Sequence, residues 1–205
     1  MSKGYALESG KAMLRTLVYA VILLLYFIPV LIVFLHGFDD FFEFFRRITG
    51  LIGIVSLFMA IILSSLVKYS KIIFGTTYLK VHHLFSITGL ILVTLHPIIM
   101  AIDFGTSRIF IPNFSSWNAF LANAGRPALY LIYIATLAVI LRKNLKNYWR
   151  FFHSLLYPAF VFGAIHGMRQ GSDLRNVSLY TLFVIMIAAV IVNFIYKRYQ
   201  LNFRK

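Results

Sequence analysis

Residues 81–102 read VHHLFSITGLILVTLHPIIMAI, a largely apolar stretch without Lys, Arg, Asp or Glu and with histidines near both ends. An α-helix of about 20 apolar residues is long enough to cross the roughly 30 Å hydrocarbon core of a bilayer. Because lipid offers the backbone no hydrogen-bond partners, such a stretch must pair its own N–H and C=O groups. The stretch is therefore predicted to be a transmembrane helix.

Five further stretches have the same character, and the composition agrees with them. The chain is 60% hydrophobic and 13% charged, whereas a soluble domain carries about 25% charged residues. The predicted spans are 14–35, 48–66, 81–102, 128–141, 149–168 and 179–196, of which the fourth is short and is expected to begin a few residues earlier. None shows the alternation of a barrel strand. The predicted fold is an all-α integral membrane bundle of six transmembrane helices, forming a single domain over 1–205.

The net charge of +14 is distributed unevenly between the predicted loops. Fourteen of the 20 basic residues lie in the termini and in alternate loops. The other loops carry every acidic residue except Glu8, together with Arg46, Arg47, Arg108, Arg126, Arg169 and Arg175. The positive-inside rule then places both termini in the cytoplasm of a multi-pass plasma-membrane protein. This distribution favours an orientation signal over nucleic-acid binding.

Histidines are the side chains best suited to hold a cofactor. The chain has no cysteine, which excludes thiolate sites and iron–sulfur clusters. The third span has His82 and His96, fourteen residues apart, and the fifth, reading FHSLLYPAFVFGAIHG over 152–167, has His153 and His166, thirteen apart. Ligating side chains within spans are costly and usually functional. His36, at the end of the first span, is interpreted as an interfacial polar residue.

The four histidines define two levels in the membrane. Each spacing corresponds to roughly 20 Å along a helix, so one histidine of each helix lies near each face. Since both helices run in the same direction, the imidazoles meet in two pairs, one at each level. Paired imidazoles between helices are the ligands of a bis-histidine haem. The sequence therefore predicts two stacked b-type haems, held by His82 with His153 and by His96 with His166.

The angles between these histidines add a structural prediction. At 100° per residue, a step of fourteen residues returns to within roughly 40° of the same helix face, but thirteen leave an offset of roughly 140°. A proline within a helix removes a backbone hydrogen bond, and Pro158 lies between His153 and His166. The fifth helix is therefore expected to be irregular there.

Two sets of neighbouring residues are further cofactor-binding candidates. Only one of His82 and His83 can face the bundle core; spacing favours His82, which leaves His83 to the interface or to a contact behind the ligands. Haem propionates need cationic partners. The candidates are Arg47, Arg126 and Arg169 at the outer level and Lys80 and Arg150 at the inner level.

At these residues the sequence resembles the ferric reductase-like transmembrane domain of ferric reductases and NADPH oxidases. The resemblance rests on the H-x13-H and H-x12-H spacings and on AIHG at 164–167. In size, and in Arg126-Pro127 and NYWRFFHSLLY at 147–157, the chain is similar to the haem membrane subunit of the periplasmic methionine-sulfoxide reductase system. The resemblance covers the chain from about Arg47 to the sixth span.

The resemblance implies electron transfer from a cytoplasmic donor through both haems to an extracytoplasmic acceptor, which is a protein, ferric iron or oxygen. The chain lacks the glycine-rich motif and the room for a nucleotide domain, so the expected donor is a separate flavin reductase or a quinol, with flavin or quinone supplied by that partner. The chain is then an oxidoreductase component without catalytic residues of its own. The alternative is a small transporter or assembly factor with structural or metal-binding histidines, which discontinuous helices or paired intramembrane charges would favour.

Overall fold

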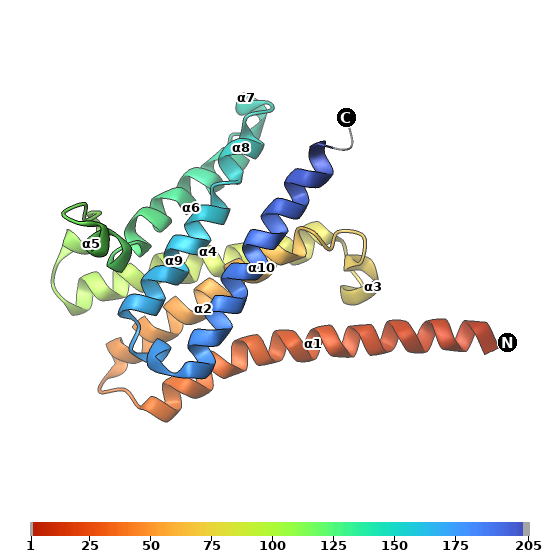
Figure 1. Cartoon of the computed structure of the whole chain (residues 1–205), viewed down its shortest axis with the longest axis horizontal. Helices are drawn as coiled ribbons and strands as arrows, with labels where there is room; N and C mark the ends of the chain where they lie inside the picture. Colours follow the sequence, from red (N-terminus) through yellow and green to blue (C-terminus); the bar gives the residue numbers. More distant parts are fainter. Residues whose placement is uncertain (1, 203–205) are drawn as a thin grey trace.

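The computed structural model describes residues 2–202, with side chains for 8–200, and every regular element in that part is a helix (Figure 1). The predicted all-α class is therefore confirmed. The main helices are α1 (Ser2–His36), α2 (Phe41–Leu63), α4 (Tyr78–Asp103), α6 (Gly125–Ile140), α8 (Trp149–His153), α9 (Leu156–Gln170) and α10 (Val177–Asn202). The short helices are α3 (Ser70–Phe74), η1 (Ser107–Phe110), α5 (Trp117–Ala122), α7 (Arg142–Leu145) and η2 (Ser172–Arg175).

Five segments of the described chain are long and apolar enough to cross a membrane, which supports a membrane protein. They are Glu8–His36, Phe41–Leu63, Tyr78–Asp103, Trp149–Gln170 and Val177–Gln200. The remaining apolar helix, α6, begins at Gly125, three residues before the predicted start at 128, but has only 16 residues. At 1.5 Å per residue it measures about 24 Å, less than the hydrocarbon core. The count of six spans and the cytoplasmic position of the termini stay predictions.

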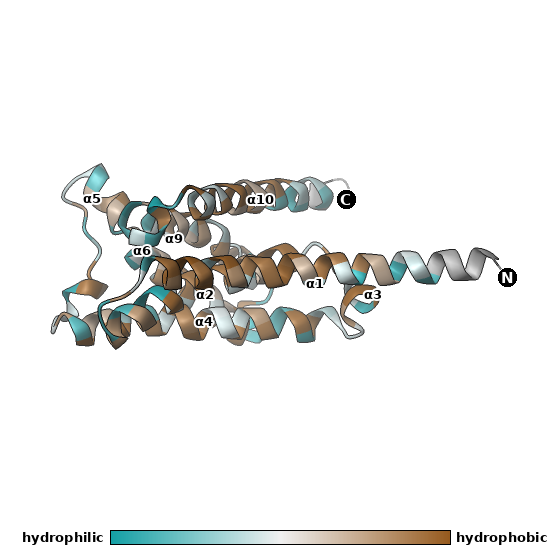
Figure 2. Cartoon of the chain, turned by 90° about the horizontal axis from the view of Figure 1, so that it is seen from below, coloured by the Kyte–Doolittle hydropathy of each residue, from teal (hydrophilic) through white to brown (hydrophobic). Residues whose placement is uncertain are grey.

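The two ends of the bundle differ in charge. At one end, named here the acidic end, Arg46 pairs with Asp103 at 2.6 Å and Arg47 pairs with Asp173. The opposite end carries α3, α7 and the last turns of α10. It is named here the basic end because these helices contain Lys71, Arg142, Lys143 and Lys197. Figures 1 and 2 place α3, the first half of α1 and the last turns of α10 toward one side, and α5 toward the other.

The helix α2 forms the centre of the core and packs most extensively against α4. Two glycines permit the close approach of these helices. A Cβ added to Gly89 would lie 2.8 Å from Cδ2 of Leu57, and one added to Gly53 would lie 2.9 Å from Cγ1 of Val93. Small residues at helix interfaces in membranes bring backbones together in this way. The pairing fixes α4, and with it two of the histidines, against the core.

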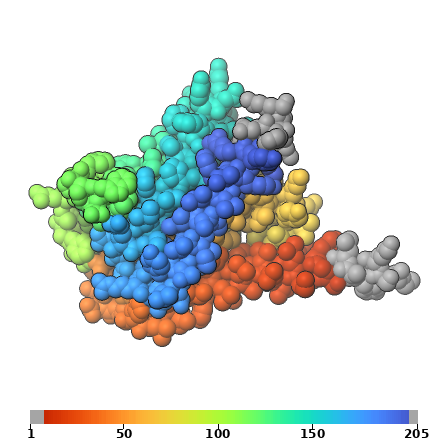
Figure 3. Space-filling model, in the orientation of Figure 1, coloured from red at the N-terminus to blue at the C-terminus, as the bar shows by residue number. Residues whose placement is uncertain are grey.

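The helix α1 follows one edge of the molecule, and much of its surface stays exposed (Figure 3). It is tied to α2 by a hydrogen bond between the hydroxyls of Tyr26 and Ser56, 2.8 Å apart. Hydrophobic residues cover the middle of α1 and of α10 (Figure 2). Exposed apolar faces of this extent suit contact with lipid.

Candidate functional site: two histidine pairs

The first pair lies toward the basic end, where His82 of α4 faces His153 at the end of α8. The centroids of the two rings are 6.5 Å apart, and the ring planes are inclined at 75°. Two imidazole nitrogens that bind opposite sides of one metal ion, at about 2 Å each, place their ring centroids about 6 Å apart. The separation of the rings therefore fits a shared metal ion.

The second pair lies toward the acidic end, where His96 of α4 and His166 of α9 line one cavity of about 510 Å³. This volume is within the range of roughly 300–1,000 Å³ that is usual for ligand and cofactor sites. The walls are largely apolar side chains of α2, α4, α6 and α9. Such a space can accept a flat hydrophobic cofactor between the helices.

All four imidazoles are oriented in the same way, by a contact between Nδ1 and a backbone carbonyl oxygen. The distances are 3.1 Å for His82 with Ala60, 2.8 Å for His96 with Arg46, 3.4 Å for His153 with Ala135 and 2.6 Å for His166 with Ala122. A histidine that binds a metal usually donates its other ring N–H to such an acceptor, which fixes the tautomer. The arrangement leaves Nε2 of each ring for a ligand.

The carbonyls that orient two of these rings come from helix ends. Ala60 lies in the last turn of α2 and Ala122 is the last residue of α5, where carbonyls have no partner within the helix. The amide of Ser64, which would reach Ala60 in a longer helix, bonds instead to Ile61 and Ile62. The ends of α2 and α5 thus place free acceptors beside the histidines.

Glycines provide the space for the rings of the acidic-end pair. A Cβ added to Gly125, the first residue of α6, would lie 2.5 Å from Cδ2 of His166. One added to Gly50 of α2 would lie 3.0 Å from Nδ1 of His96. Both rings therefore pack directly against the backbone of a neighbouring helix, which limits their movement.

The fifth predicted span is interrupted between its two histidines, as expected. Regular helix ends at His153 and resumes at Leu156. Around the break the amides of Ser154, Leu155 and Tyr157 bond to carbonyls three residues earlier, at 3.0–3.1 Å. Pro158 has no N–H for the carbonyl of Ser154, which accepts from Tyr157 instead. The predicted irregularity is confirmed.

The tightened turn changes the angle between the two histidines of this span. A 3₁₀ step turns the chain by about 120° and an α step by about 100°. Three tightened steps therefore add about 60° and reduce the offset of about 140° to about 80°. The break brings His153 and His166 closer to one face, so that each reaches a histidine of α4.

The neighbouring candidates divide into those near the pairs and those away from them. His83 is exposed, whereas His82 is partly buried and faces His153. This geometry agrees with the preference for His82. His36 approaches Asp173, with 3.3 Å between Nδ1 and Oδ1.

Two of the three outer arginines line the cavity of the acidic-end pair. Arg47 does so while bonded to Asp173, and Arg126 does so while donating to the carbonyl of Ile111 at 2.6 Å. Arg46, which the sequence did not single out, also lines it. Arg169 is exposed and is not part of the cavity wall. The cavity therefore has cations on one rim, although Arg46 and Arg47 already have carboxylate partners.

No known family, curated protein or solved structure matches the chain. Among the described side chains, no group of three or more His, Cys, Asp or Glu is placed to hold a metal ion. A haem iron needs only two protein ligands because the porphyrin supplies the other four. The two pairs suit that donor set.

Proposed function

We propose that the chain is a transmembrane electron carrier with two b-type haems, of the ferric reductase-like kind. The observation that carries the proposal is the set of four imidazoles, paired at two levels and each anchored through Nδ1. His82 and His153 would hold one haem, and His96 and His166 the other. A bound haem with two histidine ligands accepts and releases single electrons at its iron.

The chain's own residues would fix the positions of the two redox centres and limit their contact with water. Along α4 the two histidines are roughly 20 Å apart, a separation that leaves space for two cofactors between the membrane faces. The carbonyls of Ala60, Arg46, Ala135 and Ala122 hold the rings, and the core around α2 keeps the helices together. Charged side chains at the cavity rim set the local potential.

Electrons would enter at the basic end and leave at the acidic end. With the basic end in the cytoplasm, outward transfer is assisted by about 2.3 kcal/mol per 100 mV of membrane potential. The donor would be a separate flavin reductase or a quinol. The acceptor would be a protein, ferric iron or oxygen outside the plasma membrane.

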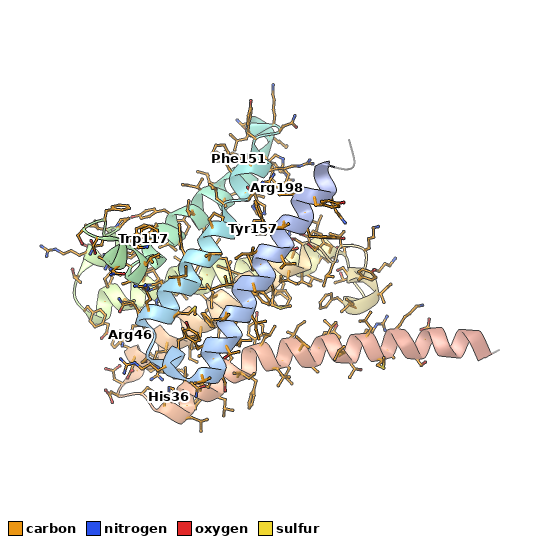
Figure 4. The ribbon with its side chains drawn as sticks, in the orientation of Figure 1. His36, Arg46, Trp117, Phe151, Tyr157 and Arg198 are labelled. Carbon is orange, nitrogen blue, oxygen red and sulfur yellow. The ribbon has the colours of Figure 1, made fainter. Side chains whose placement is uncertain are left out.

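Aromatic rings connect the acidic-end pair with the surface and support an exit on this side. Phe162 lies one turn before His166 on α9 and meets Phe120 edge to face, with ring centroids 5.7 Å apart. Phe120 stacks with Trp117 at 5.5 Å, and Trp117 is 70% exposed. Trp117 is the first residue of α5, and Figure 4 shows it in the region of α5 and α6. An acceptor bound there would be within a short chain of rings from the histidine pair.

The second candidate, a transporter or assembly factor, gains some support from the break before α9 and from two ion pairs. However, the backbone at the break is bonded through 3₁₀ turns, so it offers few free carbonyls to an ion. The ion pairs involve residues at the ends of helices, such as Arg46 near the start of α2 and Asp103 at the end of α4. Neither feature forms a polar site at mid-membrane.

Spectroscopy of the purified protein, produced in haem-replete cells, tests the proposal. The wild type is expected to show b-type absorbance from two haems. His153→Ala should lose the haem at the basic end and His166→Ala the haem at the acidic end, each with the other retained. A colourless wild type would refute the proposal and would favour the transporter or assembly factor.

A further inference from the structure

Lys197 lies in the penultimate turn of the described part of α10, toward the basic end. Its Nζ donates a hydrogen bond to the hydroxyl of Ser64, 2.5 Å away, at the end of α2. One turn earlier, buried Asn193 donates to the carbonyl of Ile61 at 3.0 Å and accepts from the hydroxyl of Ser65. These bonds attach α10 to the end of α2 and hold Lys197 in place.

The position of Lys197 is unusual for a lysine because its ammonium group is partly buried beside the first histidine pair. Its partner Ser64 lies one turn after Ala60, whose carbonyl contacts Nδ1 of His82, so Lys197 meets the same end of α2 as this pair. Among the described side chains no carboxylate forms an ion pair with it. A partly buried charge without an opposite charge is costly, so the position suits the binding of an anion.

Two tyrosines lie near this part of the molecule, Tyr157 beside Ser64 and Tyr78 beside His82. Tyr157 of α9 lies beside the Ser64 side chain and packs against Phe194, with ring centroids 4.9 Å apart. Tyr78 of α4 stacks on His82 at 5.3 Å. Figure 4 shows Tyr157 directed into the region between α9 and α10. The surface thus combines one cation with several hydroxyl groups.

We propose that Lys197, together with Ser64 and Tyr157, binds a propionate of the haem held by His82 and His153. The inference rests on the proposed function, which places a haem at this pair. A carboxylate that accepts from an ammonium and from hydroxyl groups forms charge-assisted hydrogen bonds, which are about twice as strong as neutral ones. Lys197 follows the sixth predicted span, on α10, a helix that supplies none of the four histidines.

The proposal replaces the inner cations that the sequence suggested. Lys80 and Arg150 are both exposed. Arg150 lies over the ring of Trp149, 5.7 Å from its centroid. In contrast, Lys197 is partly buried and has a hydroxyl, rather than a carboxylate, as its partner.

The test compares Lys197→Gln with Lys197→Arg and with Lys80→Gln, which removes the same charge from an exposed position at the same end. For each detergent-purified protein, the rate of haem release is measured by transfer to apomyoglobin. The midpoint potentials are measured by potentiometric titration. Lys197→Gln should release the basic-end haem about tenfold faster or more, as expected for a lost hydrogen bond to a charged group. The midpoint potential of the basic-end haem should fall in this variant, because a nearby cation favours the reduced form of the haem. Lys197→Arg and Lys80→Gln should stay close to the wild type.

The haem at the acidic end serves as an internal control, since its retention in Lys197→Gln shows that the protein is folded. Wild-type release and potential in Lys197→Gln would overturn the propionate site while leaving the haem proposal intact. The anion at Lys197 would then be a lipid phosphate, detected as phospholipid that the variant loses in native mass spectrometry. A haem-free wild type would instead refute the proposed function itself.

Discussion

Gly125→Ala is expected to displace the ring of His166 without straining the backbone. Gly125 is not among the residues with positive φ, so alanine is compatible with its conformation. The new Cβ would lie 2.5 Å from Cδ2 of His166 and 3.0 Å from its Nε2. Carbon atoms in contact are separated by about 3.5 Å or more, so the ring must move by about 1 Å. This is half of a metal–nitrogen bond of about 2 Å.

The displacement should weaken haem binding at the acidic end more than it weakens the fold. Overpacking costs about 1–3 kcal/mol, and disturbance of the groups that orient a ligand typically costs 10–100-fold in metal affinity. We expect the purified variant to retain about one haem, with the acidic-end component missing from the potentiometric titration. Gly50→Ala, whose Cβ would lie 3.0 Å from Nδ1 of His96, should show a smaller effect.

Gly10→Ala is the matched control because no atom lies within 4 Å of the Cβ that it adds. It should bind two haems and keep the wild-type potentials. The reasoning is refuted if Gly125→Ala also binds two haems with unchanged spectrum and potentials. The imidazole of His166 would then not be a ligand in the position that the structure gives it.

Three further predictions concern other parts of the molecule. Pro158→Ala restores the missing N–H, so the helix should become more regular there. The position of His153 should then rotate, which weakens haem binding at the basic end, as measured by the b-type absorbance of the purified protein. Pro29→Ala, in α1, should leave that absorbance unchanged. His83→Ala should keep both haems, and loss of the basic-end haem would show that His83 is the ligand. Asp173→Asn should lower the free energy of unfolding by about 3 kcal/mol because it removes the carboxylate that binds both Nε and Nη2 of the nearly buried Arg47, and leaves Glu43 as its carboxylate partner. Asp103→Asn removes a more exposed ion pair and should lower the free energy of unfolding by at most about 1 kcal/mol. Chemical denaturation of both variants measures these values.

Much of the fold could be predicted from residue character alone. Apolar length located the long helices, and Pro158 with the thirteen-residue spacing located the break before α9. Helix boundaries were less accurate, since α2 begins at Phe41, seven residues before the predicted start at 48. Its amphipathic first turns, with Glu43, Arg46 and Arg47, are too polar for a criterion based on apolar length.

The approach of His82 to His153 could be predicted because the rise per residue sets the depth of each position along a helix. The surroundings of the histidines could not be predicted, because they depend on contacts between segments that are distant in the sequence. The Nδ1 acceptors are backbone carbonyls, which carry no sequence signal, and they lie 18 to 50 residues from their histidines. Lys197 looked like one of many basic topology signals, and only the packing of α10 against α2 brings it to the first pair.

The central claim is that imidazoles from two helices bind two haems, one at each level. The most direct test is a count of haem per chain in the purified wild type, by pyridine haemochrome absorbance against protein concentration, with a redox titration to resolve the components. Two haems per chain, with two resolved midpoint potentials, are expected. Protein from haem-replete cells that is folded and contains no haem would contradict the account.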